Sequence, residues 1–432
     1  VLAQLKDAKA EVRALVMDGD PLARELPQNV RVVTGDVCDE AALGRFFAGA
    51  DEHTCVIHCA GMISVCRGDA AKRGWMIAGV GFAGALLFVF KYTAFFANSF
   101  LSLFGAEARV AGLKLPIGIS FYTFQIISYT VDVYRGETPA QRSFARLLLY
   151  VSCFPQLIAG PIVQYSDVAK QIGSRKTTAK DFTRGMQRFV VGLGKKVIFA
   201  NICGLILRDL PLADAGAMSF GGAWYAGFVY MLQVYFDFSG YSDMAIGIGK
   251  MLGFDFCENF NYPYISASIT EFWRRWHISL SSWLRDYLYI SLGGNRKGKF
   301  RQYLNLIITM FLGGLWHGAS WNFVLWGTFH GIALALHKMW MSITGRKKGE
   351  QSHGWRRVFG VIITFHFVCF CWIFFRNADF QNSMDMLKQI VTTFRPQLFP
   401  QLLEGYWKVF ALMLLGFLLH FAPDSWEDAV CR

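Results

Sequence analysis

The chain has 432 residues, of which 54% are hydrophobic, 16% are aromatic and only 17% are charged. A soluble protein of this length carries about a quarter charged residues, so the composition argues against a soluble globular protein. The net charge of +12 comes from Lys and Arg residues that flank apolar runs and form no continuous stripe, so no nucleic-acid-binding surface is expected.

The first 66 residues are predicted to differ from the rest of the chain. They contain 6 Lys and Arg against 10 Asp and Glu, a net charge of −4, whereas the remaining residues carry +16. Apolar runs at Val12–Asp18, Val30–Asp39 and Thr54–Gly61, with a helical pattern at 40–50 between the last two, predict a small parallel α/β unit.

This segment resembles the middle of an NAD(P)-binding domain of the dehydrogenase or sugar-nucleotide epimerase type. The resemblance implies that Asp18, Asp36, Ala60 and Gly61 would lie near a dinucleotide. The first strand and the glycine-rich turn that hold the pyrophosphate in such domains have no counterpart here. We therefore interpret residues 1–66 as a truncated Rossmann-like fragment that binds no cofactor, with a working NAD(P) enzyme as the alternative.

From about Gly74 the sequence changes to long apolar runs, which predict an all-α polytopic membrane protein over residues 67–432. The first run contains a single charge, Lys91. Several runs are short or interrupted by Gly and Pro, as is tolerated where the backbone is buried in protein or lines a cavity. The predicted spans are roughly Trp75–Ala97, Ile117–Tyr134, Phe144–Pro161, Phe189–Leu207, Ala223–Tyr241, Tyr303–Gly318, Trp321–Trp340, Phe359–Phe375 and Val409–Phe421.

Four polar stretches interrupt the apolar texture, and the first two are Leu115–Glu137 and Phe154–Asp167. In the first, Ser, Tyr and Gln recur at three- and four-residue steps and therefore share one helix face. This pattern fits interhelical hydrogen bonding as well as the lining of a cavity. In the second, two prolines and a glycine predict a broken helix or a re-entrant turn.

The third polar stretch, Tyr235–Phe254, contains two carboxylates among aromatic residues. Asp237 and Asp243 could bind a cation, orient a histidine or pair with a distant arginine, and pairing is the leading interpretation. Both remain candidates for substrate binding.

The fourth polar stretch, Ile269–Phe300, places Arg274 and Arg275 beside Trp276 and His277. Trp and Tyr mixed with Arg are typical of a helix that lies in the membrane interface. The basic groups could also hold the phosphates of a lipid or of a thioester donor. An interfacial helix alone explains the charges, but it does not explain a histidine with two neighbouring tryptophans.

His317 follows 40 residues after His277, in the sequence GGLWHGASWN, where Trp316 precedes it. An ionisable ring at membrane depth is costly and by default indicates function, although a lone histidine there is more often a hydrogen-bonded packing residue. His330 and His337 lie in the same region and favour function. The ten cysteines are scattered without a CxxC pair, and the sequence contains no HExxH motif, so no metal site is predicted. It also contains no GxSxG motif, so no serine nucleophile is predicted.

Four motifs resemble the membrane-bound O-acyltransferase family over about residues 75–425. They are WRRWHISLSSWLRDYLYISLGGNRKG, GGLWHGASWNFVLWGTFHG, LPIGISFYTFQIISYTVDVYRG and FPQLIAGPIVQYSD. Within this family the branch of the integral membrane subunit of alginate O-acetyltransferase is the most similar, and the membrane protein of teichoic-acid D-alanylation is more distant. The resemblance implies a helical bundle with a central tunnel. Family members begin with several further membrane spans, and residues 1–66 stand in their place here.

The resemblance also implies roles for individual residues. His317, in the WHG motif, would be the essential catalytic residue and would act as a general base. His277 would lie near the same tunnel and support the reaction. Donor or acceptor would be bound by residues around them, for which the candidates are Arg274, Arg275, Trp276, Trp316, Asn322, Asp237 and Asp243.

We therefore expect an O-acetyltransferase of the bacterial cytoplasmic (inner) membrane that acts in the acetylation of an exported polysaccharide such as alginate. As the resemblance implies, the acetyl donor is acetyl-CoA on the cytoplasmic side, and no cofactor is bound tightly. The expected partners are membrane lipid, periplasmic acetyltransferases of the polysaccharide machinery, and a polysaccharide or carrier acceptor.

Three alternatives remain open from the sequence. D-alanyl transfer to teichoic acid, or acetylation of peptidoglycan or cellulose, would use the same motifs. A proton-coupled transporter or channel would use the histidines as a proton relay. A functional NAD(P) enzyme would depend on the N-terminal segment alone.

Overall fold

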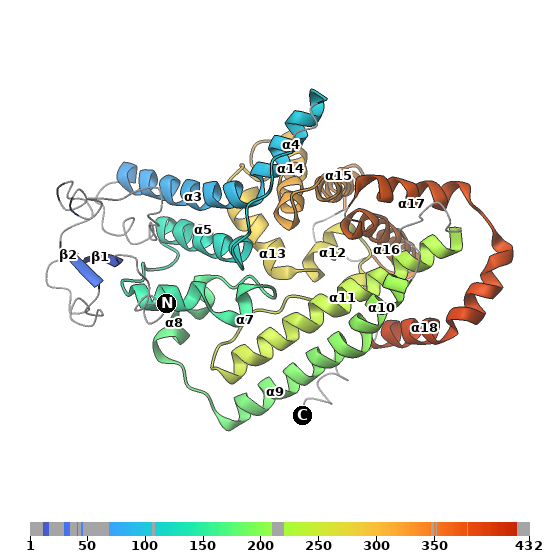
Figure 1. Cartoon of the computed structure of the whole chain (residues 1–432), viewed down its shortest axis with the longest axis horizontal. Coiled ribbons are helices and arrows are strands. Elements are labelled where there is room, and N and C mark those ends of the chain that lie inside the picture. Colours follow the sequence, from blue (N-terminus) through green and yellow to red (C-terminus); the bar gives the residue numbers. More distant parts are fainter. Residues whose placement is uncertain are drawn as a thin grey trace. The chain divides into compact units, whose positions relative to one another are not determined.

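The computed structural model describes residues 12–16, 30–34, 41, 45, 69–105, 109–209, 220–346, 350, 352–377 and 379–420. The chain forms two compact units, one of residues 1–86 and 125–152 and the other of residues 87–124 and 153–432. Most of the described secondary structure is helical, as the composition predicts (Figure 1). The predicted boundary at residue 66 lies outside the described residues.

The N-terminal segment contains two short strands, β1 (Val12–Val16) and β2 (Val30–Thr34). They pair in parallel, with Val12 opposite Val30, so the first two predicted strands and their direction are confirmed. The third predicted strand and the residues assigned to a dinucleotide, Asp18, Asp36, Ala60 and Gly61, lie outside the described residues. Two strands alone do not support a dinucleotide-binding unit.

Two helices contribute residues to both units, α3 (Asp69–Lys91) and α5 (Ile119–Arg135), and α6 (Phe144–Val151) belongs to the first unit. The polar stretch at Leu115–Glu137 is helical over Ile119–Arg135 as predicted, and Gln125, Ser128, Tyr129 and Asp132 of its polar side chains are buried. Within the first unit the Tyr129 hydroxyl accepts a hydrogen bond from the Gln141 N–H at 2.7 Å, which illustrates the structural use of this face.

A single span at Phe144–Pro161 is wrong, because the chain breaks twice within it. After α6 a one-turn helix, α7 (Phe154–Leu157), has proline near its start, and Gly160 takes a positive φ of 98°. The backbone then stays non-helical until α8 (Tyr165–Ser174), which begins with a capping box made by Gln164 and Asp167. The predicted break at Phe154–Asp167 is confirmed.

Two long helices pack against each other in the second unit. The first is α9 (Ala179–Gly194), which continues through the π-helical turn η3 (Lys195–Ala200) into α10 (Asn201–Asp209). It lies beside the 32-residue helix α11 (Phe220–Met251) (Figure 1). A Cβ atom at Gly185 would lie 2.6 Å from the carbonyl oxygen of Gly247, so glycine lets these two backbones touch.

Charged side chains join α9, η3 and α11. Asp243, which is 4% exposed, accepts hydrogen bonds from Arg188 Nε at 2.7 Å and Lys195 Nζ at 2.6 Å. Asp237 pairs with Lys196. Pairing with a distant arginine, the leading interpretation, is confirmed for Asp243, which contacts Arg188. Asp237 pairs with a lysine instead.

The stretch at Ile269–Phe300 is divided into short helices. The elements are η5 (Pro263–Ile265), just before it, α12 (Ile269–Arg275), α13 (Ile278–Trp283) and the π-helical η6 (Leu284–Tyr289). Trp273, Trp276 and Trp283 are at most 7% exposed. These large apolar rings are packed inside the protein, so they do not form the lipid-facing side of one interfacial helix, which was one interpretation of this stretch.

The remaining helices follow in chain order. They are α14 (Lys299–His317), α15 (Trp321–Ile343), α16 (Gly354–Arg376), α17 (Phe380–Thr392), η7 (Pro396–Leu398) and α18 (Phe399–His420), which bends at Tyr406. Only three residues connect α14 to α15, and the two helices pack antiparallel. A Cβ atom at Gly327 would overlap the carbonyl oxygen of Met310 and lie 3.0 Å from the Cα of Gly314. The two backbones are therefore in direct contact.

Among the described residues, three helices are long and apolar enough to cross a membrane: 71–91, 179–208 and 354–376. A helix pair at 396–405 and 407–418, bent by 83°, would form a fourth span if it crosses as one. The predicted spans in α11, α14 and α15 are helical, but these helices are not among those apolar enough to be identified as membrane-crossing by composition alone. This is consistent with helices that carry functional polar groups inside a bundle.

We predict that Gly327→Val separates α14 from α15 and destabilises the protein by about 1–3 kcal/mol, because the added atoms overlap backbone rather than flexible side chain. The measurement is the thermal unfolding of purified protein in detergent. Gly84→Ala is the control, since no atom lies within 4 Å of a Cβ at that position. An unchanged unfolding temperature for Gly327→Val would contradict the close contact.

We also predict that Asp243→Asn destabilises the protein by about 3 kcal/mol, because it leaves Lys195 without its countercharge and leaves Arg188 paired with the exposed Glu258 alone. The matched control is Asp255→Asn, whose carboxylate is 63% exposed and pairs with Lys250. Exposed pairs contribute about 1 kcal/mol or less. Equal effects of the two variants on unfolding temperature would show that the Asp243 cluster is not a structural ion pair.

Candidate active site

Three histidines of the second unit are connected by two tryptophans. Trp316 lies between His277 and His317, with ring centroids 6.3 and 4.9 Å from theirs. Trp326 lies between His317 and His330, at 5.1 and 4.9 Å. The two predicted catalytic histidines are therefore brought into contact with one indole, and His330 extends the cluster.

His317 is the last residue of α14, and its ring is surrounded by aromatic side chains. Besides the two tryptophans, Phe375 of α16 lies 5.1 Å away and Phe323 of α15 6.4 Å away. With the described residues this ring makes aromatic contacts but no hydrogen bond. Both of its nitrogens are therefore available to a reactant, in a side chain that is only partly buried.

Trp316 is held at both ends by polar contacts. Its indole Nε1 donates to the carbonyl oxygen of Ser120 at 3.1 Å. Its own carbonyl oxygen accepts a hydrogen bond from the Lys91 ammonium, which also donates to the Ser120 hydroxyl at 3.0 Å. The ring stacks on Phe124, which in turn stacks on Trp283 at 3.7 Å. These contacts fix the position of the indole that both histidines contact.

His277 is 1% exposed and occupies the junction between α12 and α13 with a positive φ of 44°. A left-handed backbone at a non-glycine residue is strained and is retained where the surroundings require it. Its Nδ1 lies 3.0 Å from the Oδ1 of Asn259. Its Nε2 is buried, with no hydrogen-bond partner among the described residues.

His330, in α15, is fully buried. Its Nδ1 accepts a hydrogen bond from the indole Nε1 of Trp273 at 3.2 Å. Its Nε2, like that of His277, is buried and unpartnered among the described residues. Unpaired polar atoms of this kind are rare in native interiors and call for an explanation.

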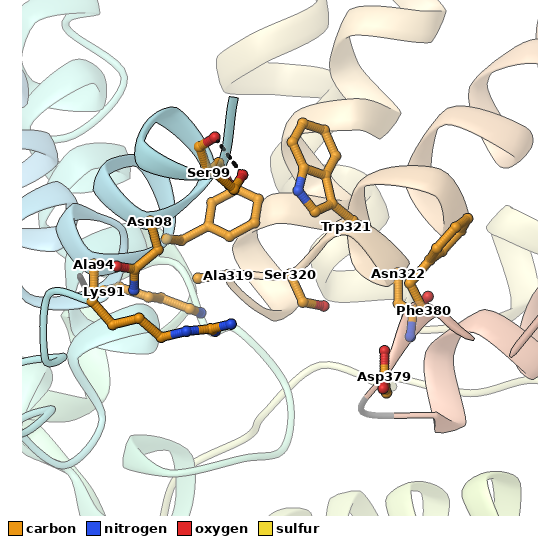
Figure 2. Close-up of a pocket in the computed structure, with 13 residues that line it drawn as sticks. Lys91, Ala94, Asn98, Ser99, Ala319, Ser320, Trp321, Asn322, Asp379 and Phe380 are labelled. Atoms are coloured by element: carbon orange, nitrogen blue, oxygen red, sulfur yellow. Dashed lines mark hydrogen bonds between the residues drawn. The ribbon is translucent and has the colours of Figure 1, made fainter. Parts of the chain in front are cut away.

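A pocket of about 580 Å³ is lined by residues that follow His317 in the chain, from Ala319 to Asn322, but not by His317 itself. Figure 2 shows Lys91, Asn98 and Ser99 from the end of α3 and from α4 (Thr93–Leu103) on one side, and Ser320 and Asn322 on the other. The full lining is Lys91, Ala94, Phe95, Asn98, Ser99, Ser102, Arg109, Ala319, Ser320, Trp321, Asn322, Asp379 and Phe380. Two cations and one carboxylate in this lining favour an anionic ligand group.

The predicted binding residues are only partly brought together. Asn322 lines the pocket, and its Nδ2 donates to the carbonyl oxygen of Asn377 at 2.6 Å. Trp276 packs in the core against Phe272. Arg274 is exposed, and Arg275 pairs with Glu271 at 3.0 Å.

Two further predicted residues, Asp237 and Asp243, take part in ion pairs with Lys196, Arg188 and Lys195. None of these carboxylates lines the pocket.

Except for Asn322, the pocket residues were not predicted from sequence, and neither were Lys91 and Asn259 as contacts of the histidine cluster. Lys91 stood out as the one charge in an apolar run, and a charge in such a run is a signal of function, but nothing in the sequence connected it to Trp316. Asn259 lies in an irregular segment without any motif, and only the fold places it against His277.

Cys257, two residues before Asn259 in the chain, is disfavoured as a nucleophile. Burial, together with the charge of Asp167, raises the pKa of the Cys257 thiol to about 12, so it stays protonated at neutral pH. Among the residues that the structure describes, no three His, Cys, Asp or Glu side chains are grouped as metal ligands.

Comparison with known proteins identifies relatives. A protein named "Probable alginate O-acetylase" from Azotobacter vinelandii is 48% identical over 325 residues, which are 74% of this chain and 63% of that protein. Its counterpart in Pseudomonas aeruginosa is 47% identical over 74% of this chain and 60% of its own length. A peptidoglycan O-acetyltransferase of Helicobacter pylori is 38% identical over 75% of this chain and 66% of its own length. The chain thus spans about 60% of the length of the alginate O-acetylases that it matches.

The model of the membrane-bound O-acyltransferase family matches residues 137–377, which are 241 of the 432 residues. The matched part contains α12 to α15 and therefore all three histidines of the cluster. The chain belongs to the membrane-bound O-acyltransferase family.

Proposed function

We propose that this protein transfers acetyl groups across or at the membrane for the O-acetylation of an exported polysaccharide such as alginate, with His317 as the general base. The observation that carries the proposal is the His317 imidazole, which has no hydrogen bond with the described residues. In the chain it lies just before the segment 319–322 that lines the pocket, although it does not line the pocket itself. The identity of 47–48% to alginate O-acetylases supports acetyl as the transferred group and alginate as the polymer.

In this mechanism a ring nitrogen of His317 removes the proton of an acceptor hydroxyl while its oxygen attacks the acetyl carbonyl. A new C–O ester bond forms, the C–S bond of the donor thioester breaks, and the departing thiolate recovers the proton from the imidazolium. Acetyl-CoA on the cytoplasmic side is the proposed donor and acts as a substrate rather than a tightly bound cofactor. His277, across Trp316, assists by binding or orienting a reactant.

The pocket after His317 is the proposed binding region for the anionic part of one reactant. Lys91 and Arg109 supply positive charge there, and Ser320 and Asn322 supply hydrogen-bonding groups. Phosphates of the donor and the carboxylates of a uronate polymer share this anionic chemistry. Arg274 and Arg275, which lie outside this pocket, are the weaker candidates for such contacts.

The proposed location is the bacterial cytoplasmic membrane, where lipid surrounds the apolar helices and periplasmic acetyltransferases pass the group to the polymer. Residues 1–66 are proposed to be a Rossmann-like fragment without a role in the reaction. A nucleotide titration of the whole chain tests this point, because binding of NAD(P) would assign the fragment a function.

The first prediction of the proposal is that His317→Ala lowers acetyl transfer by at least about 10²-fold, because the acceptor loses its base. The measurement is the acetyl content of alginate exported by cells that lack their own alginate O-acetylase and express this chain at matched level. His353→Ala is the control, since His353 is exposed at the start of α16. Unchanged acetyl content in the His317 variant would overturn the proposal.

The same cells distinguish the other acceptors. The Helicobacter pylori relative is named for peptidoglycan, and a relative of Bacillus subtilis, 29% identical, is named for D-alanyl transfer to teichoic acid. Acetyl groups on peptidoglycan rather than alginate, or D-alanine on teichoic acid, would change the assigned substrate. Proton flux through liposomes that contain the chain but no acyl donor would instead indicate a transporter.

A further inference from the structure

We propose that Asn259 is a positioning residue that holds His277 with its proton on Nδ1, so that Nε2 presents a lone pair to a reactant. The consequence for catalysis rests on the function proposed above. The placement of the proton does not, because it follows from hydrogen bonds within the protein.

The orientation of the Asn259 amide is fixed by a donor that cannot be reversed. The backbone N–H of Ser279 lies 3.3 Å from Asn259 Oδ1, and a backbone N–H can only donate. The Ser279 hydroxyl donates to the same oxygen at 2.9 Å. On the other side the Asn259 Nδ2 donates to the Ser242 hydroxyl at 3.0 Å. Turning the amide over would place NH₂ against an N–H.

This orientation decides the state of the imidazole. The Asn259 Oδ1 accepts only, and it lies 3.0 Å from His277 Nδ1. The hydrogen bond therefore requires the proton on Nδ1, and a neutral ring then has a bare lone pair on Nε2. Asn259 is 0% exposed, so no bulk solvent competes for this bond.

The network extends to the break in the helix at Phe154–Asp167. The Ser279 hydroxyl, while donating to Asn259, accepts the backbone N–H of Ile162 at 2.9 Å. Four separate segments thus converge on one amide oxygen and its neighbours: α11, the 254–262 segment, the start of α13 and the turn after Gly160. The hydrogen bonds of this network hold the imidazole of His277 in place. Its Nε2 is the one ring nitrogen that they leave open.

The free Nε2 atom points to a ligand that donates a hydrogen bond. It is buried and unpartnered among the described residues, and its ring is edge-on to the indole that also contacts His317. A hydroxyl of the acceptor and an amide N–H of the donor's pantetheine arm both have this chemistry. His330 has the opposite arrangement, because Trp273 donates to its Nδ1 and its neutral ring must carry the proton on Nε2.

The test is ¹⁵N magic-angle-spinning NMR of the full chain in lipid, with labelled histidine and the His277 signals identified by their loss in His277→Gln. We expect a protonated Nδ1 and a bare Nε2. In Asn259→Leu the proton should move to Nε2, the ordinary preference of a free imidazole, and kcat of acetyl transfer should fall about 10²–10⁴-fold with KM changed much less. Asn259→Asp, which keeps an acceptor oxygen, should restore the wild-type signals and most of the rate.

Asn305→Leu is the matched control, since Asn305 is also 0% exposed but donates to backbone carbonyls of the 292–294 turn. It should leave the His277 signals unchanged. A proton on Nε2 in the wild type, or an unmoved proton in Asn259→Leu, would overturn the inference. If Asn259→Leu does not fold, the spectra of the wild type and Asn259→Asp still decide. If the wild-type chain transfers no acetyl groups, the proposed function is wrong. The spectra would still test which nitrogen of His277 carries the proton.

Discussion

The direct contact of the α14 and α15 backbones is the constraint on which the rest of the site depends. Glycines at 314 and 327 leave no room for a Cβ atom between the helices, and the turn that joins them contains three residues. The last residues of α14 are thereby held against the first turns of α15. The contact brings His317, at the end of α14, against Trp326 of α15, while His317 also contacts its neighbour Trp316.

Around this contact the protein retains polar atoms that it does not pair. The Nε2 atoms of His277 and His330 are buried and unpartnered among the described residues, at a typical cost of about 1–3 kcal/mol each. The nearby Trp316 is, by contrast, hydrogen-bonded at both its indole and its carbonyl. The indole Nε1 of Trp326, which contacts both His317 and His330, is unpartnered as well in the part of the chain that the structure describes. The open atoms therefore gather around the histidine cluster, where a reactant would explain them.

The sequence could predict the histidines but not the groups that control them. A ring that is costly to bury in an apolar stretch is visible in the sequence, and so are the broken helix at Phe154–Asp167 and the helical class. The burial of Trp273 and Trp283 could not be predicted, because Trp beside Arg is equally typical of an interface. The ion pairs of Asp243 and the contact of Asn259 with His277 join residues that are 18 to 55 positions apart. Such contacts depend on helix packing and leave no local periodicity.

His277 and His330 differ in which ring nitrogen carries the proton, a difference that the composition of the cluster does not reveal. Three imidazoles near two indoles would be chemically alike if each were free to exchange its tautomer. Asn259 accepts from His277, whereas Trp273 donates to His330, so one open nitrogen is an acceptor and the other is a donor. An acceptor suits a group that is losing a proton, and an N–H suits a group that is gaining negative charge, as an acyl oxygen does in a tetrahedral intermediate. Because His317 has no hydrogen bond with the described residues, its ring is the one free to exchange a proton in the proposed reaction.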